Sequence, residues 1–161
     1  MILPENYNEG VKGIAHMFYL ILLAWLAFDQ WSKYWVIHHF FVGESIPVIP
    51  GIFHWTFIMN RGAAFGILQN QSVFFLIIVG ILCGMYWYYR KQILCATPIV
   101  QVGAALLLSG AIGNAIDRYV YHGVIDFMDF RLWPIFNVAD IGICIGVLLL
   151  VCHFISSDDE M

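Results

Sequence analysis

The stretch GNAIDRYVYHGVIDFMDFRLWPIFNVAD, residues 113–140, separates two long apolar runs and carries most of the aspartates that precede the C-terminal tail. It holds four of the five aspartates that precede the C-terminal tail and two arginines, namely Asp117, Asp126, Asp129, Asp140, Arg118 and Arg131. Burying a carboxylate in an apolar environment is costly, and an acidic residue beside membrane segments usually has a function. The stretch therefore predicts a functional site at the end of a hydrophobic helix bundle.

The composition around this stretch is typical of an α-helical polytopic membrane protein. Of the 161 residues, 61% are hydrophobic and 11% are charged, and the formal net charge is −4. The seven lysines and arginines are scattered, so no basic surface for nucleic acid is indicated. The length fits a single domain, residues 1–161. The four cysteines show no CxxC spacing, which is typical of small buried hydrophobic residues.

Four apolar runs are long enough to cross a membrane, since about 20 helical residues span the hydrocarbon core. We predict membrane-spanning helices over about residues 14–36, 72–89, 97–116 and 138–155, and we interpret the first as a retained span rather than a cleaved signal peptide. Residues 1–13 are assigned no structure. Four spans place both termini on the same side of the membrane, but the basic residues do not decide which side that is.

The segment between the first two runs is predicted to form a small β-sheet over about residues 43–70. Pro50 and Gly51 favour a turn, and the run FHWTFIM, residues 53–59, alternates its side chains between two faces as a strand does. Its aromatic face is expected to rest on lipid or on a bound peptide. The connection between the third and fourth runs, about residues 119–136, is predicted to be a loop.

This topology brings polar residues that are distant in the sequence to one face of the membrane. We expect the group to contain Asp29, Lys33, Asn60, Asn114, Asp117, Arg118, Asp126, Asn137 and Asp140. Several members have simpler structural explanations. Asp29 and Lys33, four residues apart, would form an ion pair on one helix face. Asn114 and Asp117 could end the third helix, where Arg118 would be favoured near the helix C-terminus.

The remaining members also have structural explanations. Asn137 and Asp140 fit a capping box at the start of the last helix. Asp126 and Asp129 could be solvated residues of a loop. The gathering of so many polar groups at one membrane depth nevertheless favours a site.

Two carboxylates held close together would give this site acid–base chemistry. They cannot both ionise cheaply, so the pair holds one proton near neutral pH. The ionised partner can take a proton from water, and the protonated partner can donate one to a leaving amine. Asp140, at the positive end of a helix, is expected to ionise more easily, which leaves the proton on Asp126. The residues alone do not rank Asp126 above Asp117 as the second carboxylate.

Five blocks of sequence together resemble lipoprotein signal peptidase, which is bacterial signal peptidase II. They are DQWSK (29–33), NRGAAFG (60–66), GNAIDR (113–118), VIDF (124–127) and FNVAD (136–140). The resemblance implies four transmembrane helices, an extracytoplasmic β-cradle between the first two, and a multi-pass position in the bacterial inner membrane with both termini cytoplasmic. It implies an aspartic endopeptidase, active near the extracytoplasmic face, that cuts prolipoproteins before a cysteine carrying diacylglycerol.

The resemblance also implies a role for each residue of the site. It implies that Asp126 and Asp140 are the catalytic pair. The residues implied to bind substrate or to support the site are Asn60, Gly62, Asn114, Asp117, Arg118, Asn137, Asp29 and Lys33. The loop at about 119–136 would act as a lid, although only 13 residues separate the two catalytic aspartates, a short connection for this family. A monomer inhibited by globomycin is implied, with membrane lipid as a partner and no cofactor or metal.

Three other functions are compatible with parts of the pattern. A carboxylate-gated transporter or proton channel would also hold acidic residues in the membrane, but near the midplane and in an internal repeat. A metallopeptidase could use His38, His39, His54 or His122, but their spacing does not match HExxH. A non-catalytic assembly factor could be built as a capped four-helix bundle.

Overall fold

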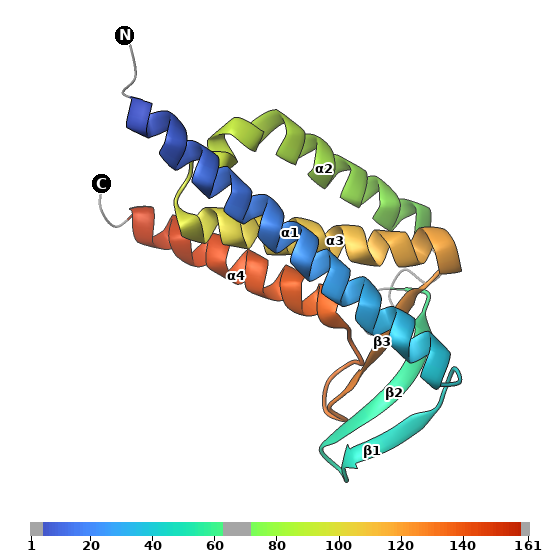
Figure 1. Ribbon diagram of the computed structural model, residues 1–161. Coiled ribbons are helices and arrows are strands. Elements are labelled where there is room, and N and C mark those ends of the chain that lie inside the picture. The colour runs from blue at the N-terminus through green and yellow to red at the C-terminus, as the bar shows by residue number, and fades with distance from the viewer. Residues whose placement is uncertain (1–4, 63–71, 159–161) are drawn as a thin grey trace.

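The fold is seen in a computed structural model that describes residues 5–62 and 72–158. Four helices and three strands make up this described part, in the order α1 Glu5–His39, β1 Ser45–Ile49, β2 Phe53–Asn60, α2 Ser72–Leu94, α3 Pro98–Tyr121, β3 Val124–Asp129 and α4 Val138–Asp158. Successive helices run in opposite directions in one bundle (Figure 1). The sheet lies at the end of the bundle opposite the start of α1 and the end of α4.

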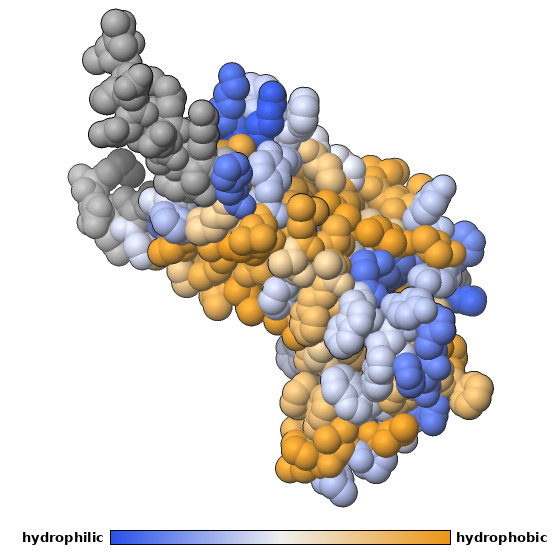
Figure 2. All heavy atoms as spheres, in the orientation of Figure 1, coloured by the Kyte–Doolittle hydropathy of each residue, from blue (hydrophilic) through white to orange (hydrophobic). Residues whose placement is uncertain are grey.

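Among the described residues, three helices are long and apolar enough to cross a membrane, namely α2, α3 and the part of α4 from Val138 to Ser156. Apolar side chains cover the middle of the bundle (Figure 2). The candidate spans found among the described residues do not include α1. The predicted count of four spans is therefore not confirmed, although the 35 residues of α1 extend for about 50 Å.

α1 is longer than the sequence predicts. It begins at Glu5, so the prediction that residues 1–13 lack structure is wrong for residues 5–13. Gly10 and Gly13 each disfavour a helix by about 1 kcal/mol. That cost is small here because lengthening an existing helix needs no new nucleus.

α3 also continues beyond its predicted end near residue 116, to Tyr121. Asp117 and Arg118 therefore lie within the helix and do not end it. The helix stops at His122, which has a left-handed φ of 58° and donates its backbone N–H to the Arg118 carbonyl at 3.2 Å. Such a left-handed residue is a common helix terminator.

The sheet is antiparallel with the strand order β1-β2-β3. The first two strands confirm the small sheet predicted between the first two helices, and residues 63–70 of that prediction lie outside the described residues. The prediction of a loop over 119–136 is wrong where β3 forms. β3 pairs with β2, so that Asn60 lies opposite Val124 and Ile58 lies opposite Asp126. β3 forms a strand because it pairs with β2, and a partner so distant in the sequence gives no local signal.

α3 is the central helix, and its small residues let its neighbours approach. A Cβ on Gly110 would collide with the backbone carbonyl oxygen of Ala139 at the start of α4. A Cβ on Gly113 would collide with the carboxylate of Asp29 on α1. The small residues of this helix therefore bring α1 and α4 close to each other. α2, in contrast, packs mainly against α3 and contains no fully buried residue.

Gly110→Ala is expected to destabilise the protein by about 1–3 kcal/mol, because a backbone carbonyl cannot move aside as a side chain can. The matched control is Gly80→Ala in α2, where the added Cβ meets no atom within 4 Å. Thermal unfolding in detergent compares the two variants. Equal unfolding midpoints for Gly110→Ala and the parent would contradict the close helix contact.

Candidate active site

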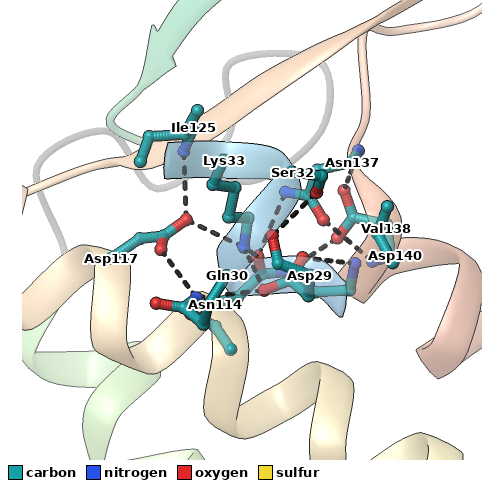
Figure 3. Close-up of polar contacts among 12 residues, drawn as sticks. Asp29, Gln30, Ser32, Lys33, Asn114, Asp117, Ile125, Asn137, Val138 and Asp140 are labelled. Atoms are coloured by element: carbon teal, nitrogen blue, oxygen red, sulfur yellow. Dashed lines mark hydrogen bonds and ion pairs between the residues drawn. The ribbon is translucent and has the colours of Figure 1, made fainter. Parts of the chain in front are cut away.

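A buried lysine lies at the centre of the polar residues between the helices (Figure 3). The Lys33 Nζ lies 2.9 Å from Asp29 Oδ2, 2.9 Å from Asp117 Oδ2 and 3.0 Å from Asn114 Oδ1. Lys33 is 1% exposed, and the two aspartates are no more exposed than that. A buried cation is tolerated only with such partners. The ion pair predicted between Asp29 and Lys33 is confirmed, but it extends to α3 and lies inside the bundle.

The two aspartates of this network also hold other elements in place. Asp29 Oδ1 accepts the backbone N–H of Ala139 at 2.8 Å, which joins α1 to the first turn of α4. Asp117 Oδ2 accepts the backbone N–H of Ile125 at 3.2 Å, which joins α3 to β3. The residue after each of these contacts is one of the predicted catalytic aspartates, so the network fixes the backbone beside both of them.

Gln30 is a member of this network that the sequence did not single out. Its Nε2 donates to Asp29 Oδ2 at 3.1 Å, to the Gly113 carbonyl at 3.3 Å and to Asp117 Oδ1 at 3.3 Å. It therefore bridges the two carboxylates that flank Lys33. Its position directly after Asp29 in the DQWSK block was the only available signal.

The predicted capping box at the start of α4 is confirmed. The Asp140 N–H donates to Asn137 Oδ1 at 3.0 Å, and the Asn137 N–H donates to Asp140 Oδ2 at 3.1 Å. The side-chain amide of Asn137 also donates to Asp126 Oδ1 at 2.7 Å. Asn137 thus contacts Asp140 through its backbone N–H and its Oδ1, and Asp126 through its side-chain amide.

Asn114 completes the connection between the lysine network and the aspartates. Its Oδ1 accepts from Lys33 and, at 3.1 Å, from Asn137, while its Nδ2 donates to Asp140 Oδ1 at 2.8 Å. Both oxygens of Asp140 therefore accept a hydrogen bond. Because Lys33 can only donate, the orientation of the Asn114 amide is fixed.

Asp126 lies on β3 and is 2% exposed, which rules out the simpler explanation of a solvated loop residue. Its second oxygen accepts the Asn60 side-chain amide at 2.9 Å, and Asn60 Oδ1 accepts the Gly62 N–H at 3.0 Å. Burial and then the charge of Asp140 raise the pKa of Asp126 to about 7, against the opposing hydrogen bonds from Asn60 and Asn137. A carboxyl group in this environment is half protonated near neutral pH.

These polar groups border a cleft of about 490 Å³, which we call the site cleft. The polar residues that line it are Asn60, Gly62, Asn114, Arg118, Asp126 and Asp140. Its other walls are apolar and come from α2, α3, α4 and residues 133–136. The Arg118 guanidinium lies 4.3 Å from the ring centroid of Phe75 on α2, which makes it part of the wall between α2 and α3.

The structure thus gathers all ten predicted site residues and divides them into two layers. Six line the cleft, and the other four, Asp29, Lys33, Asp117 and Asn137, lie buried behind it. Two carboxylates with different surroundings in one cleft can supply a base and an acid at neutral pH.

Comparison with known proteins gives consistent matches over most of the chain. Residues 21–156 match the sequence profile of the family described as signal peptidase (SPase) II. A Halothermothrix orenii protein named lipoprotein signal peptidase is 38% identical over 139 residues, which cover 85% of this chain and 94% of that protein. A Brevibacillus brevis protein of the same name is 43% identical over 141 residues, covering 83% and 91%.

Solved structures agree with these matches. One structure of a bacterial membrane enzyme superposes with a TM-score of 0.83 at 34% identity and covers 90% of this chain and 91% of its own. A second has a TM-score of 0.76 at 36% identity and covers 86% and 92%.

Proposed function

Because this chain belongs to the signal peptidase II family, we propose that it removes the signal peptide of diacylglyceryl-modified prolipoproteins by cutting just before the lipidated cysteine. We propose that it does so as an aspartic endopeptidase whose catalytic pair is Asp126 and Asp140. The observation that carries this proposal is that both carboxylates line one cleft and accept hydrogen bonds from Asn137.

The surroundings of the two carboxylates support a division of roles. Asp140 accepts two hydrogen bonds, from Asn114 and Asn137, at the N-terminus of α4, and both features favour its ionised form. Asp126 is buried on β3, and its raised pKa favours the protonated form. Asp140 is therefore the base and Asp126 the acid, although the pair titrates as one coupled unit.

Hydrolysis then proceeds in two steps. Asp140 takes a proton from water while the water oxygen attacks the scissile carbonyl carbon, and Asp126 donates its proton to the carbonyl oxygen. The tetrahedral intermediate collapses as the C–N bond breaks, and the nitrogen receives the proton held by Asp140. The hydroxyl formed from the carbonyl oxygen returns its proton to Asp126 as the C=O bond of the new carboxylic acid forms. Each carboxylate ends in its starting state, so no other proton donor is required.

The pH dependence of the reaction follows from the acid role of Asp126. The protonated form is active, so kcat/KM is expected to fall as the pH rises through about 7. Asn60→Ala removes a hydrogen bond that lowers this pKa, so it should move the alkaline limb to higher pH. The measurement is kcat/KM from pH 5 to 9 for both proteins. An alkaline limb that stays in place in Asn60→Ala would contradict the assignment of Asp126 as the acid.

The other residues of the site are proposed to position the pair or the substrate. Lys33, Asp29 and Asp117 hold the backbone next to each catalytic aspartate. Asn60 and Arg118 face the cleft and are placed to contact the peptide. The cleft combines residues of the sheet with residues of α2, α3 and α4, and for this reason we treat residues 1–161 as one peptidase domain.

We further propose that α1 is the fourth span and that the chain is a monomer in the bacterial inner membrane. The start of α1 and the end of α4 lie at the same end of the bundle (Figure 1). Lys33 and Arg131, at the sheet end of the bundle, are paired with carboxylates. Arg90 and Lys91 near the end of α2 are then the basic residues that favour a cytoplasmic location for their own end, because positive residues concentrate in cytoplasmic loops. The sheet and the site would then lie at the extracytoplasmic face.

The test is cleavage of two precursors by the purified protein in lipid vesicles. One precursor carries the diacylglyceryl group on its cysteine, and the other carries the unmodified cysteine. Cleavage of the lipidated precursor alone is the expected result, with globomycin as a competitor that raises KM. No cleavage of either precursor would contradict the function. Unchanged cleavage at saturating globomycin would contradict the assignment of the cleft.

A further inference from the structure

The segment 130–136 between β3 and α4, which we call the cleft loop, is closed at its base. Met128 donates its N–H to the Phe136 carbonyl at 2.9 Å, and Phe136 donates its N–H to the Met128 carbonyl at 3.2 Å. Within the loop, the Leu132 N–H donates to the Phe130 carbonyl at 2.7 Å. This pairing joins the last residue of the loop to β3 of the sheet.

A buried carboxylate holds the first turn of the cleft loop. Asp129 Oδ1 accepts the Arg131 backbone N–H at 2.8 Å, and Asp129 Oδ2 accepts the Arg131 guanidinium at 2.9 Å and the Thr56 hydroxyl at 2.8 Å. Burial would raise the pKa of Asp129, but these hydrogen bonds and the Arg131 charge lower it. Asp129 is 4% exposed, which rules out the simpler explanation of a solvated residue here too.

The hydrogen bonds to Asp129 continue across the whole sheet. The Thr56 hydroxyl donates its one proton to Asp129, so Ser45 Oγ, 2.7 Å from Thr56 Oγ1, must donate to Thr56. By the same count, the His54 Nδ1–H must donate to Ser45 Oγ at 3.2 Å. A single directed chain thus connects β1, β2 and β3 to the loop.

Two further features fix the loop in one conformation. Arg131 has a φ of 64°, which a residue other than glycine adopts only when its surroundings enforce it. The Phe130 ring packs between Phe53, with centroids 4.8 Å apart, and Phe136, with centroids 5.8 Å apart and nearly parallel planes. The loop is therefore held on its polar side by Asp129 and on its apolar side by aromatic rings.

The loop so held forms one wall of the site cleft. Trp133, Pro134, Ile135 and Phe136 line the same cleft as Asp126 and Asp140. Trp133 remains 65% exposed, so its indole stands at the rim with most of its surface available for contact. Leu132, its neighbour, is 97% exposed and does not line the cleft.

We propose that Asp129, Thr56 and Arg131 clamp the cleft loop as a fixed wall of the active site, and that Trp133 on this wall contacts the substrate and determines specificity. The proposal rests on the peptidase function proposed above. The ligand chemistry is an apolar group next to the scissile bond, because an exposed indole at a membrane surface offers a broad apolar face. That group is either an acyl chain of the substrate or an apolar side chain of its signal peptide.

The first arm of the test compares Trp133→Ala with Leu132→Ala, a matched control in the same loop. Trp133→Ala is expected to raise KM about tenfold with kcat unchanged, because it removes contact area and leaves the catalytic pair intact. Leu132→Ala should resemble the parent. Equal KM values for the two variants would overturn the role of Trp133. Cleavage by the parent protein in the same assay tests the proposed peptidase function independently of that role.

The second arm identifies the group that Trp133 contacts. Precursors with shorter acyl chains and precursors with alanine at the apolar positions before the cysteine are compared in the parent and in Trp133→Ala. The contacted group is the one whose shortening raises KM in the parent but not in the variant. Parallel responses of parent and variant to both changes would overturn the contact.

The third arm tests the clamp as a positioning device. Asp129→Asn should raise KM, and the double variant Asp129→Asn/Trp133→Ala should have the KM of Trp133→Ala alone. Additive effects would overturn the clamp and leave Asp129 a purely structural residue.

Arg131→Gly provides a second variant that keeps the fold. Glycine accepts the left-handed φ, so this change removes the guanidinium without straining the turn. Faster hydrogen exchange of the Leu132 amide is expected in Arg131→Gly, which reports the release of the loop without reference to activity. Parent-like exchange in both Arg131→Gly and Asp129→Asn would overturn the clamp.

Discussion

Asp126→Asn and Asp140→Asn are each expected to lower kcat by about 10²- to 10⁴-fold, the contribution typical of a positioned acid or base. An asparagine at 140 can still accept the Asn137 N–H through its Oδ1, so the helix cap survives in part while the base is lost. An asparagine at 126 can still hydrogen-bond to Asn60 and Asn137, but its amide protons are not acidic enough to be donated to the substrate. KM should change little in either variant, because neither substitution alters the shape of the cleft.

The measurement is kcat with the lipidated precursor, and the control is Glu44→Gln. Glu44 lies before β1 and accepts the Phe41 N–H at 2.8 Å, on the surface and outside the cleft. This control makes the same change from carboxylate to amide at a residue that contacts neither Asp126 nor Asp140. Parent-like kcat in either aspartate variant, with an unchanged unfolding midpoint, would refute the proposed dyad.

Lys33→Met is expected to cost about 3–5 kcal/mol of stability, the usual effect of removing one partner of a buried ion pair. The substitution keeps the volume of the side chain but leaves Asp29 and Asp117 without their shared cation. Both carboxylates would then face each other without compensation. The unfolding midpoint in detergent should fall, and the remaining folded fraction should lose activity because the backbone beside Asp126 and Asp140 is no longer held.

Two comparisons separate the charge effect from the packing effect. Lys91→Met removes an exposed lysine at the end of α2 and should leave the midpoint unchanged. The triple variant Asp29→Asn/Lys33→Met/Asp117→Asn removes all three charges and should regain part of the lost stability. A triple variant less stable than Lys33→Met alone would contradict the account based on unpaired carboxylates.

Local patterns in the sequence predicted most of the helical framework. The starts of α2, α3 and α4 were within one residue of the structure, because apolar runs and their flanking residues are local signals. The capping box of Asn137 and Asp140 was also predictable, since its two residues are three apart and its geometry is fixed. The gathering of the polar blocks followed from alternating helix directions alone.

Contacts between distant segments account for what the sequence did not predict. β3 was expected to be a loop because its strand character depends on pairing with β2, more than 60 residues earlier. The burial of Asp126 and Asp129 follows from that pairing. Lys33 looked like the local partner of Asp29, and nothing in the sequence near it indicates its second carboxylate on α3. The catalytic roles of the aspartates stay predictions.

The contact of Asp29 with the backbone of Ala139 can form only late in the assembly of the helix bundle, because it joins the first helix to the last. The first helix carries a carboxylate whose acceptor oxygen is satisfied only after the last helix has entered the bundle. Asp140 and Asn137 also arrive with that last helix, so a partly synthesised chain lacks both the proposed base and the residue that links it to Asp126. A chain that lacks the last helix is therefore expected to leave Asp29 Oδ1 without its backbone donor and Asp126 without its contact with Asn137.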